Sequence, residues 1–137
     1  MKNKQMIFKI LIIFSLVILL TACGSKNGDY ELMTLEDIKE NIQYQELTLL
    51  KLDIPYSMIS RVAVNQAGYE IGNSGDKIYI YEYKSNEKLK EDKTKIHNNF
   101  NGQSIPPIIM SNYNICLVYM KKDKNEYEIE NKILKAF

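Results

Sequence analysis

Short apolar runs, some of them alternating with polar residues, predict the strands of a β-sheet. The segment 78–83 alternates isoleucine and tyrosine, and the turn residues 72–76 separate it from a short run at 69–71. Two such runs around a turn are typical of a β-hairpin. A second hairpin is predicted where Ser-Asn-Tyr-Asn interrupts an apolar stretch. The predicted strands are 47–52, 69–71, 78–83, 108–110 and 115–120.

Three other segments carry the spacing and the capping residues of amphipathic helices. Thr34 and Asp37 form a capping box, in which a hydroxyl and a carboxylate three residues apart close the start of a helix. Ser85 is placed to cap a second helix. In the last helix Ile129, Ile133 and Phe137 recur at four-residue steps. The predicted helices cover about 34–43, 85–99 and 125–137, and residues 56–62 fit a short helical turn.

Together these elements predict the α+β class. We expect an antiparallel sheet of four or five strands with helices packed on one face. The middle helix has a thin apolar stripe, Leu89, Ile96 and Phe100, and lysines fill much of the remainder. It is therefore expected to lie on the surface. The order of the strands in the sheet cannot be obtained from the pattern.

The first 25 residues have a different pattern. Three lysines precede an apolar run from Ile10 to Leu20, and Leu-Thr-Ala-Cys-Gly-Ser follows. Eleven apolar residues are short for a membrane span, which needs about 20. The segment resembles the bacterial lipoprotein signal with its lipobox. That resemblance implies cleavage before Cys23 and a diacylglyceryl group on its sulfur. An ordinary secretory signal or an uncleaved anchor helix is the alternative.

The lipobox also divides the chain. Residues 1–22 are the expected signal peptide, 23–33 are the lipidated cysteine and a short tether, and 34–137 form a single small α+β domain. Two acyl chains anchor a protein stably. The expected location is therefore the extracytoplasmic face of the cell membrane. The polar tether from Gly24 to Asp29 reaches only roughly 20 Å when extended, so the domain stays close to the membrane.

Charge excludes one class of partner. The whole chain carries 18 basic and 17 acidic side chains, and the signal segment includes three of the lysines. Without a basic field, nucleic-acid binding is not expected. Apart from Arg61 every basic residue is lysine, and asparagine and isoleucine are abundant, as in proteins from AT-rich genomes.

The body of the chain has a resemblance of its own. An aromatic-aliphatic strand leads into a Ser-capped charged helix, followed by a proline-led hairpin, a Lys/Asp turn and a final helix. Over roughly residues 35–137 this layout is similar to small uncharacterised lipoproteins of low-GC Gram-positive bacteria. The resemblance implies no activity and no site residue.

The residues offer little for catalysis. His97 is the only histidine, which excludes a His-rich metal site and a two-histidine zinc motif. The carboxylates at 36, 37 and 40 are typical of a solvated helix face. Cys116 lies in an apolar run and is interpreted as a small buried hydrophobe, with a reactive thiol as the alternative. We therefore expect no cofactor, no metal and no enzyme activity.

Tyrosine is the one enriched residue type that suggests binding. All ten tyrosines lie after Cys23, and Tyr79, Tyr81 and Tyr83 share one face of a predicted strand. A tyrosine offers a flat apolar ring with a polar tip, which suits sugars, peptides or protein surfaces. Such a face is either a binding surface or is covered by a helix.

Three functions remain open at this point. The first is a membrane-anchored, non-enzymatic interaction domain that binds an envelope protein through the tyrosine face. The second is a lipoprotein that binds a small ligand or an envelope polymer. The third is an enzyme with an unrecognised site.

Overall fold

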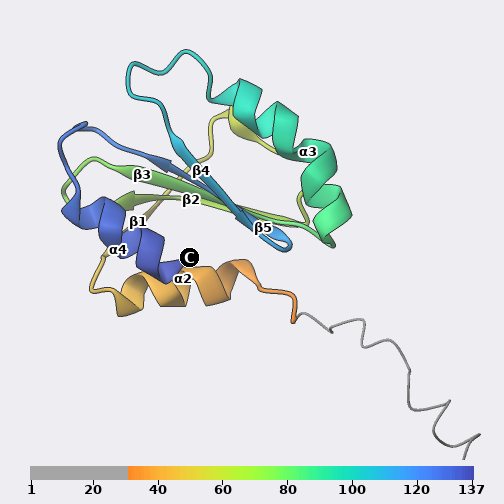
Figure 1. Cartoon of the computed structure of the whole chain (residues 1–137), viewed down its shortest axis with the longest axis horizontal. Helices are drawn as coiled ribbons and strands as arrows, with labels where there is room; N and C mark the ends of the chain where they lie inside the picture. Colours follow the sequence, from red (N-terminus) through yellow and green to blue (C-terminus); the bar gives the residue numbers. More distant parts are fainter. Residues whose placement is uncertain (1–30) are drawn as a thin grey trace, which may run out of the picture. The chain divides into compact units, whose positions relative to one another are not determined.

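A five-stranded antiparallel sheet occupies the middle of the domain (Figure 1). The computed structural model describes residues 31–137; the predicted signal peptide, Cys23 and most of the tether lie outside them. The strand order is β1-β2-β3-β5-β4, so β2, β3 and β5 each have a neighbour on both sides. The strands are β1 (Leu49–Leu52), β2 (Asn65–Ile71), β3 (Lys77–Glu82), β4 (Ile108–Asn112) and β5 (Ile115–Met120).

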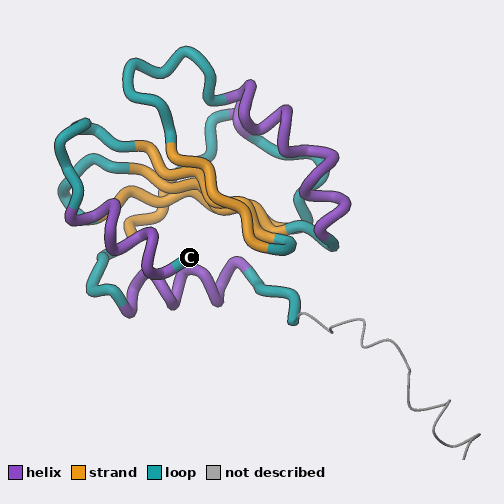
Figure 2. Tube along the Cα trace, in the orientation of Figure 1, coloured by secondary structure: helices purple, strands orange, loops and turns teal. Residues whose placement is uncertain are grey.

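Helices cover both faces of this sheet, as Figures 1 and 2 show. The α+β class and the antiparallel sheet are confirmed, but the expectation that all helices pack on one face is wrong. The helices α2 (Leu35–Tyr44) and α4 (Glu128–Ala136) lie on one face, called here the α2/α4 face. The other face, called the tyrosine face, is covered by α3 (Asn86–Asn99) and by a loop that contains the 3₁₀ turn η1 (Tyr56–Met58).

The sequence of β3 explains why both faces need a cover. Its isoleucines point to the α2/α4 face and its tyrosines to the opposite face, and both sets are buried. The neighbouring β5 is apolar on both sides as well. Strands that are apolar on both faces are stable only when helices or loops shield each face from water. The two separate apolar sets of β3 therefore require two cores.

Both predicted hairpins are confirmed. In the first, β2 and β3 are joined by a turn in which Gly72 and Gly75 have positive φ. In the second, β4 and β5 are joined by only two residues, Tyr113 and Asn114. Tyr113 has a φ of 47°, a left-handed conformation that a two-residue hairpin turn commonly requires.

The predicted helix starts hold for α2 and α3 but not for α4. Thr34 and Asp37 form the capping box, and Ser85 accepts a hydrogen bond from the Lys88 amide. The last helix begins at Glu128 rather than near residue 125. The residues before it form a side-chain-stabilised turn, in which Glu126 accepts a hydrogen bond from the Glu128 amide. Within residues 31–137, no helix combines the length and the apolar character that a membrane span requires.

Candidate functional site

The predicted binding face is buried. Tyr79, Tyr81 and Tyr83 lie beneath α3 and the η1 loop, and Tyr81 has no exposed area (0%). Burial raises the pKa of all three phenols. The tyrosine face is therefore part of the core and is not available to a partner, so the prediction of a binding surface is wrong and the alternative, a face covered by a helix, is confirmed.

Two of these tyrosines use their hydroxyls to hold the loop that covers them. This cover loop, residues 53–64, connects β1 to β2. The Tyr81 hydroxyl donates to the Met58 carbonyl at 2.8 Å, and the Tyr83 hydroxyl donates to Asp92 Oδ2 at 3.0 Å. Because both contacts join the sheet to the elements above it, the tyrosines act as supports for the loop.

A buried polar network fixes the centre of the cover loop. Asp92 of α3 and Ser60 of the loop are both buried, and the Ser60 hydroxyl donates to the Asp92 carboxylate. The same hydroxyl accepts from the amides of Val62 and Ala63. Gln66 of β2 bonds both the amide and the carbonyl of Ser60, at 2.9 and 3.0 Å. Buried networks of this kind specify a single conformation when every member is satisfied.

The outer side of the same loop forms a small groove with α3. The groove has a volume of about 210 Å³ and is lined by Tyr56, Ser57, Ile59, Arg61 and Lys95. The Tyr56 side chain is 82% exposed, and Ile59 is 37% exposed. An aromatic and an aliphatic side chain thus face water beside two cations. We refer to these five residues as the cover-loop groove.

The two cations of the groove are not neutralised by the domain. Within residues 31–137, neither Arg61 nor Lys95 takes part in an ion pair, and the groove lining includes no carboxylate. Elsewhere in α3 the arrangement differs, since Lys88 pairs with Glu91 at 2.7 Å. The groove therefore presents positive charge that is free to meet an anion.

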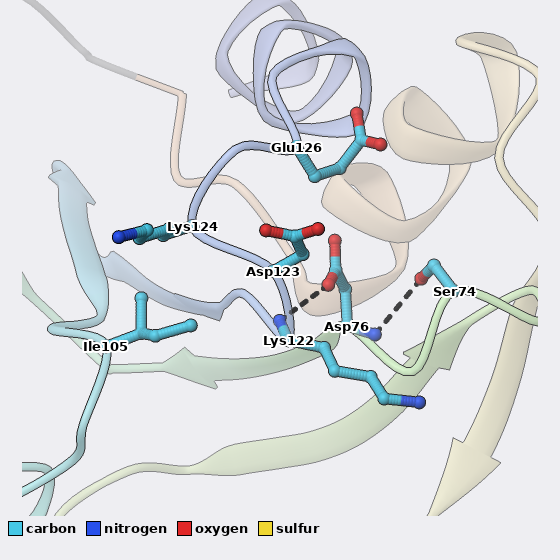
Figure 3. A pocket seen from close by; sticks show the side chains of 7 residues that line it. All are labelled: Ser74, Asp76, Ile105, Lys122, Asp123, Lys124 and Glu126. Atoms are coloured by element: carbon cyan, nitrogen blue, oxygen red, sulfur yellow. Dashed lines mark hydrogen bonds between the residues drawn. The ribbon is translucent and has the colours of Figure 1, made fainter.

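A larger cleft lies between the β2–β3 turn and the segment that follows β5 (Figure 3). It has a volume of about 600 Å³, and its only apolar lining residue is Ile105. Asp76, Asp123 and Glu126 contribute carboxylates to its lining, and Lys124 extends away from them. Small-molecule sites are mostly apolar, so this charged and open cleft is a weak match to one.

Asp76, the buried residue in the lining of that cleft, has a structural role. Asp76 accepts hydrogen bonds from the Tyr119 hydroxyl at 2.7 Å and from the Lys122 amide at 2.8 Å, and its own amide donates to Ser74 (Figure 3). These contacts tie the β2–β3 turn to the end of β5. In the part of the chain that the structure describes, no His, Cys, Asp and Glu side chains are grouped as a metal site would require.

The residues considered for catalysis are placed apart from one another. Cys116 is buried, as interpreted, and burial raises the pKa of its thiol to about 12. A thiol with such a pKa is almost entirely protonated at neutral pH and is a poor nucleophile. His97 is exposed in the last turn of α3. The geometry joins neither residue to the groove or to the cleft.

In comparison with known proteins, the chain matches no protein-family model, no curated protein and no solved structure. The cover-loop groove was not anticipated from the sequence, because residues 56–62 fitted only a short helical turn. The feature of the sequence that could have indicated the groove is Arg61, because it is the only arginine in a chain whose other basic residues are lysines.

The start of the domain is also fixed to the sheet. The Asn114 side chain, buried in the β4–β5 turn, accepts from the Met33 amide at 3.1 Å and donates to the Met33 carbonyl at 2.8 Å. The Leu35 amide donates to Glu82 at 2.9 Å. Met33 and Leu35, near the start of the described residues, are therefore held at the end of the sheet where β3 finishes.

Proposed function

We propose that this chain is a lipid-anchored, non-enzymatic interaction domain on the extracytoplasmic face of the cell membrane, and that it binds an envelope protein through the cover-loop groove. The observation that carries this proposal is the groove itself. Tyr56 and Ile59 are exposed to water beside two unpaired cations, on a loop whose backbone is fixed from below.

Rigid support for an exposed loop favours binding. Ordering a flexible segment opposes association, so a loop that is already ordered binds at a smaller entropic cost. Tyrosine and arginine are also the residue types that contribute most to protein interfaces. The buried Asp92 and Tyr81 and the half-buried Gln66 hold the backbone of the loop that carries Tyr56 and Arg61.

The chemistry of the remaining titratable groups supports a role other than catalysis. Asp92 and Asp76 are both used to hold loops, and Cys116 is buried with a raised pKa. An interaction domain needs only the exposed groove, whereas an enzyme would need a nucleophile or a base beside a cleft.

The anchor is proposed from the sequence of residues 20–25, which lie outside the described part of the chain. Labelling cells with a fatty-acid probe tests it directly. We expect the wild-type protein to be labelled and Cys23→Ser to be unlabelled. Labelling that survives Cys23→Ser would contradict the anchor and leave the groove unaffected.

Photocrosslinking in living cells tests the interaction itself. We replace Tyr56 with a benzophenone amino acid and expect one specific protein adduct. The matched control is the same replacement at Leu134, an exposed residue of α4, from which no adduct of that mass is expected. If both positions give the same set of adducts, or Tyr56 gives none, the groove is not a partner site.

A ligand-binding lipoprotein is the second candidate, and the cleft of about 600 Å³ is the observation in its favour. Its volume lies within the range of small-molecule sites, although its lining is charged. A ligand held there would contact Asp123 and Glu126. Thermal stabilisation of the wild type by an envelope saccharide, lost in Asp123→Asn, would favour this candidate over the first.

A further inference from the structure

The size of the cover-loop groove limits what it can accept. Its volume is about 210 Å³. Typical sites for cofactors and metabolites begin at about 300 Å³. The groove is therefore large enough for one or two side chains of a partner and too small to enclose a metabolite.

The charges of the groove select the kind of side chain. Arg61 presents a planar fork of N–H donors that matches the two oxygens of a carboxylate. Lys95 adds a second positive charge from α3. The lining includes no acidic group, so a negatively charged side chain meets no like charge there.

The apolar members of the groove distinguish between anionic partners. A phosphate polymer would use the two cations but would gain little from Tyr56 and Ile59, which lie in the same lining. A polypeptide brings carboxylates and apolar side chains together within a few residues. The combination of an exposed aromatic ring, an aliphatic side chain and an arginine is also characteristic of protein interfaces.

We infer that the cover-loop groove binds an acidic segment of a partner protein, with a glutamate or aspartate side chain held by Arg61 and Lys95 and a neighbouring apolar side chain packed against Tyr56 and Ile59. This inference rests on the proposed function, because it assigns the chemistry of the partner at the same groove.

The test combines the benzophenone at Tyr56 with neutral variants of the two cations, in the full-length chain in living cells. We expect Arg61→Gln and Lys95→Gln each to reduce the adduct about tenfold, the factor that corresponds to losing one charge-assisted hydrogen bond. Arg61→Lys keeps the charge but not the fork, and we expect an intermediate loss. Lys135→Gln, an exposed lysine on α4, is the matched control and should leave the adduct unchanged.

The reduced adduct is not expected to arise from unfolding of the glutamine variants, because Arg61 and Lys95 are exposed and take no part in the ion pairs of the described domain. Circular dichroism of each variant checks this directly. An adduct that forms in the wild type but is unaffected by the two glutamine variants would overturn the acidic partner and leave the proposed function intact. Absence of any adduct from Tyr56 would overturn the proposed function as well.

Competition separates the protein partner from an anionic polymer. The probes are a short peptide that contains three glutamates and one leucine, and an inorganic polyphosphate, each added to spheroplasts before irradiation. We expect the peptide to reduce the adduct more strongly at equal charge. Stronger competition by polyphosphate would overturn the inference and indicate a phosphate polymer as the natural occupant.

Discussion

The two faces of the sheet are stabilised in different ways. The α2/α4 face is mainly aliphatic, and two helices cover it with isoleucine and leucine side chains. The tyrosine face is covered by one helix with a thin apolar stripe and by a loop, and three of its central side chains are tyrosines. The first face is held mainly by buried apolar area, and its Tyr119 hydroxyl holds the β2–β3 turn through Asp76. The second face also depends on directional hydroxyl contacts, and these hold the elements that cover it.

This difference indicates separate tasks for the two faces. Apolar contacts stabilise a domain without fixing the position of any one loop, because they are non-directional. The hydrogen bonds of Tyr81, Tyr83 and Asp92 are directional, and each fixes the relative position of one donor and one acceptor. The tyrosine face therefore sets the shape of the cover loop, and the α2/α4 face supplies much of the stability that this requires.

The largest effect is expected from the aliphatic face. Ile80 has no exposed area (0%) and lies in β3 between β2 and β5. Ile80→Ala should lower the free energy of unfolding by about 4 kcal/mol, since truncating a buried isoleucine leaves a cavity. Urea denaturation of the chain from residue 31 to residue 137 measures this. Leu134→Ala at an exposed site should cost far less, and equal losses at the two positions would contradict the distinction.

A smaller effect is expected from the polar network. Asp92→Ala leaves the hydroxyls of Ser60 and Tyr83 without their acceptor and should lower the free energy of unfolding by about 2 kcal/mol. Amide exchange at Val62 and Ala63 should accelerate more than exchange in α2, because the loop loses its support. Glu91→Ala, next in sequence but exposed, is the control and should change stability by less than about 1 kcal/mol. Uniform acceleration of exchange would show that Asp92 does not act locally.

The smallest effect is expected from a single hydroxyl. Tyr81→Phe removes the hydrogen bond to the Met58 carbonyl and should cost about 1 kcal/mol. Tyr79 lies on the same face, and its ring contacts Phe100 with centroids 5.6 Å apart. Within residues 31–137 no hydrogen bond of the Tyr79 hydroxyl is found, so Tyr79→Phe should be nearly neutral. Equal effects in the two variants would mean that the Tyr81 hydroxyl does not support the loop.

Much of the fold could be predicted from the sequence because its signals are local. The capping box at Thr34, the cap at Ser85 and the turn glycines act within a few residues of chain, and each was placed correctly. Whether the tyrosine face is covered or exposed could not be decided from the sequence, because the cover depends on distant contacts. Ser60 and Asp92 meet only after the sheet has brought the loop and α3 together.

The candidate site could not be predicted for a related reason. An alternating strand reveals that two faces exist, but the same pattern fits an exposed face and a buried one. Tyr81 is buried because the cover loop closes over it, and Tyr56 is exposed because it lies on the outside of that loop. Neither outcome is encoded in the spacing of the tyrosines.

The strand order also determines when the domain can fold during synthesis. β5 is made after β4 but lies between β3 and β4, and its residues complete the cores on both faces. Until Ile115 to Met120 have been synthesised, β3 has an unpaired edge and each core lacks one wall. A chain that crosses a membrane while it is being made would therefore remain unfolded until its C-terminal part emerges. The late central strand thus delays the completion of both cores until the C-terminal part of the domain has been made.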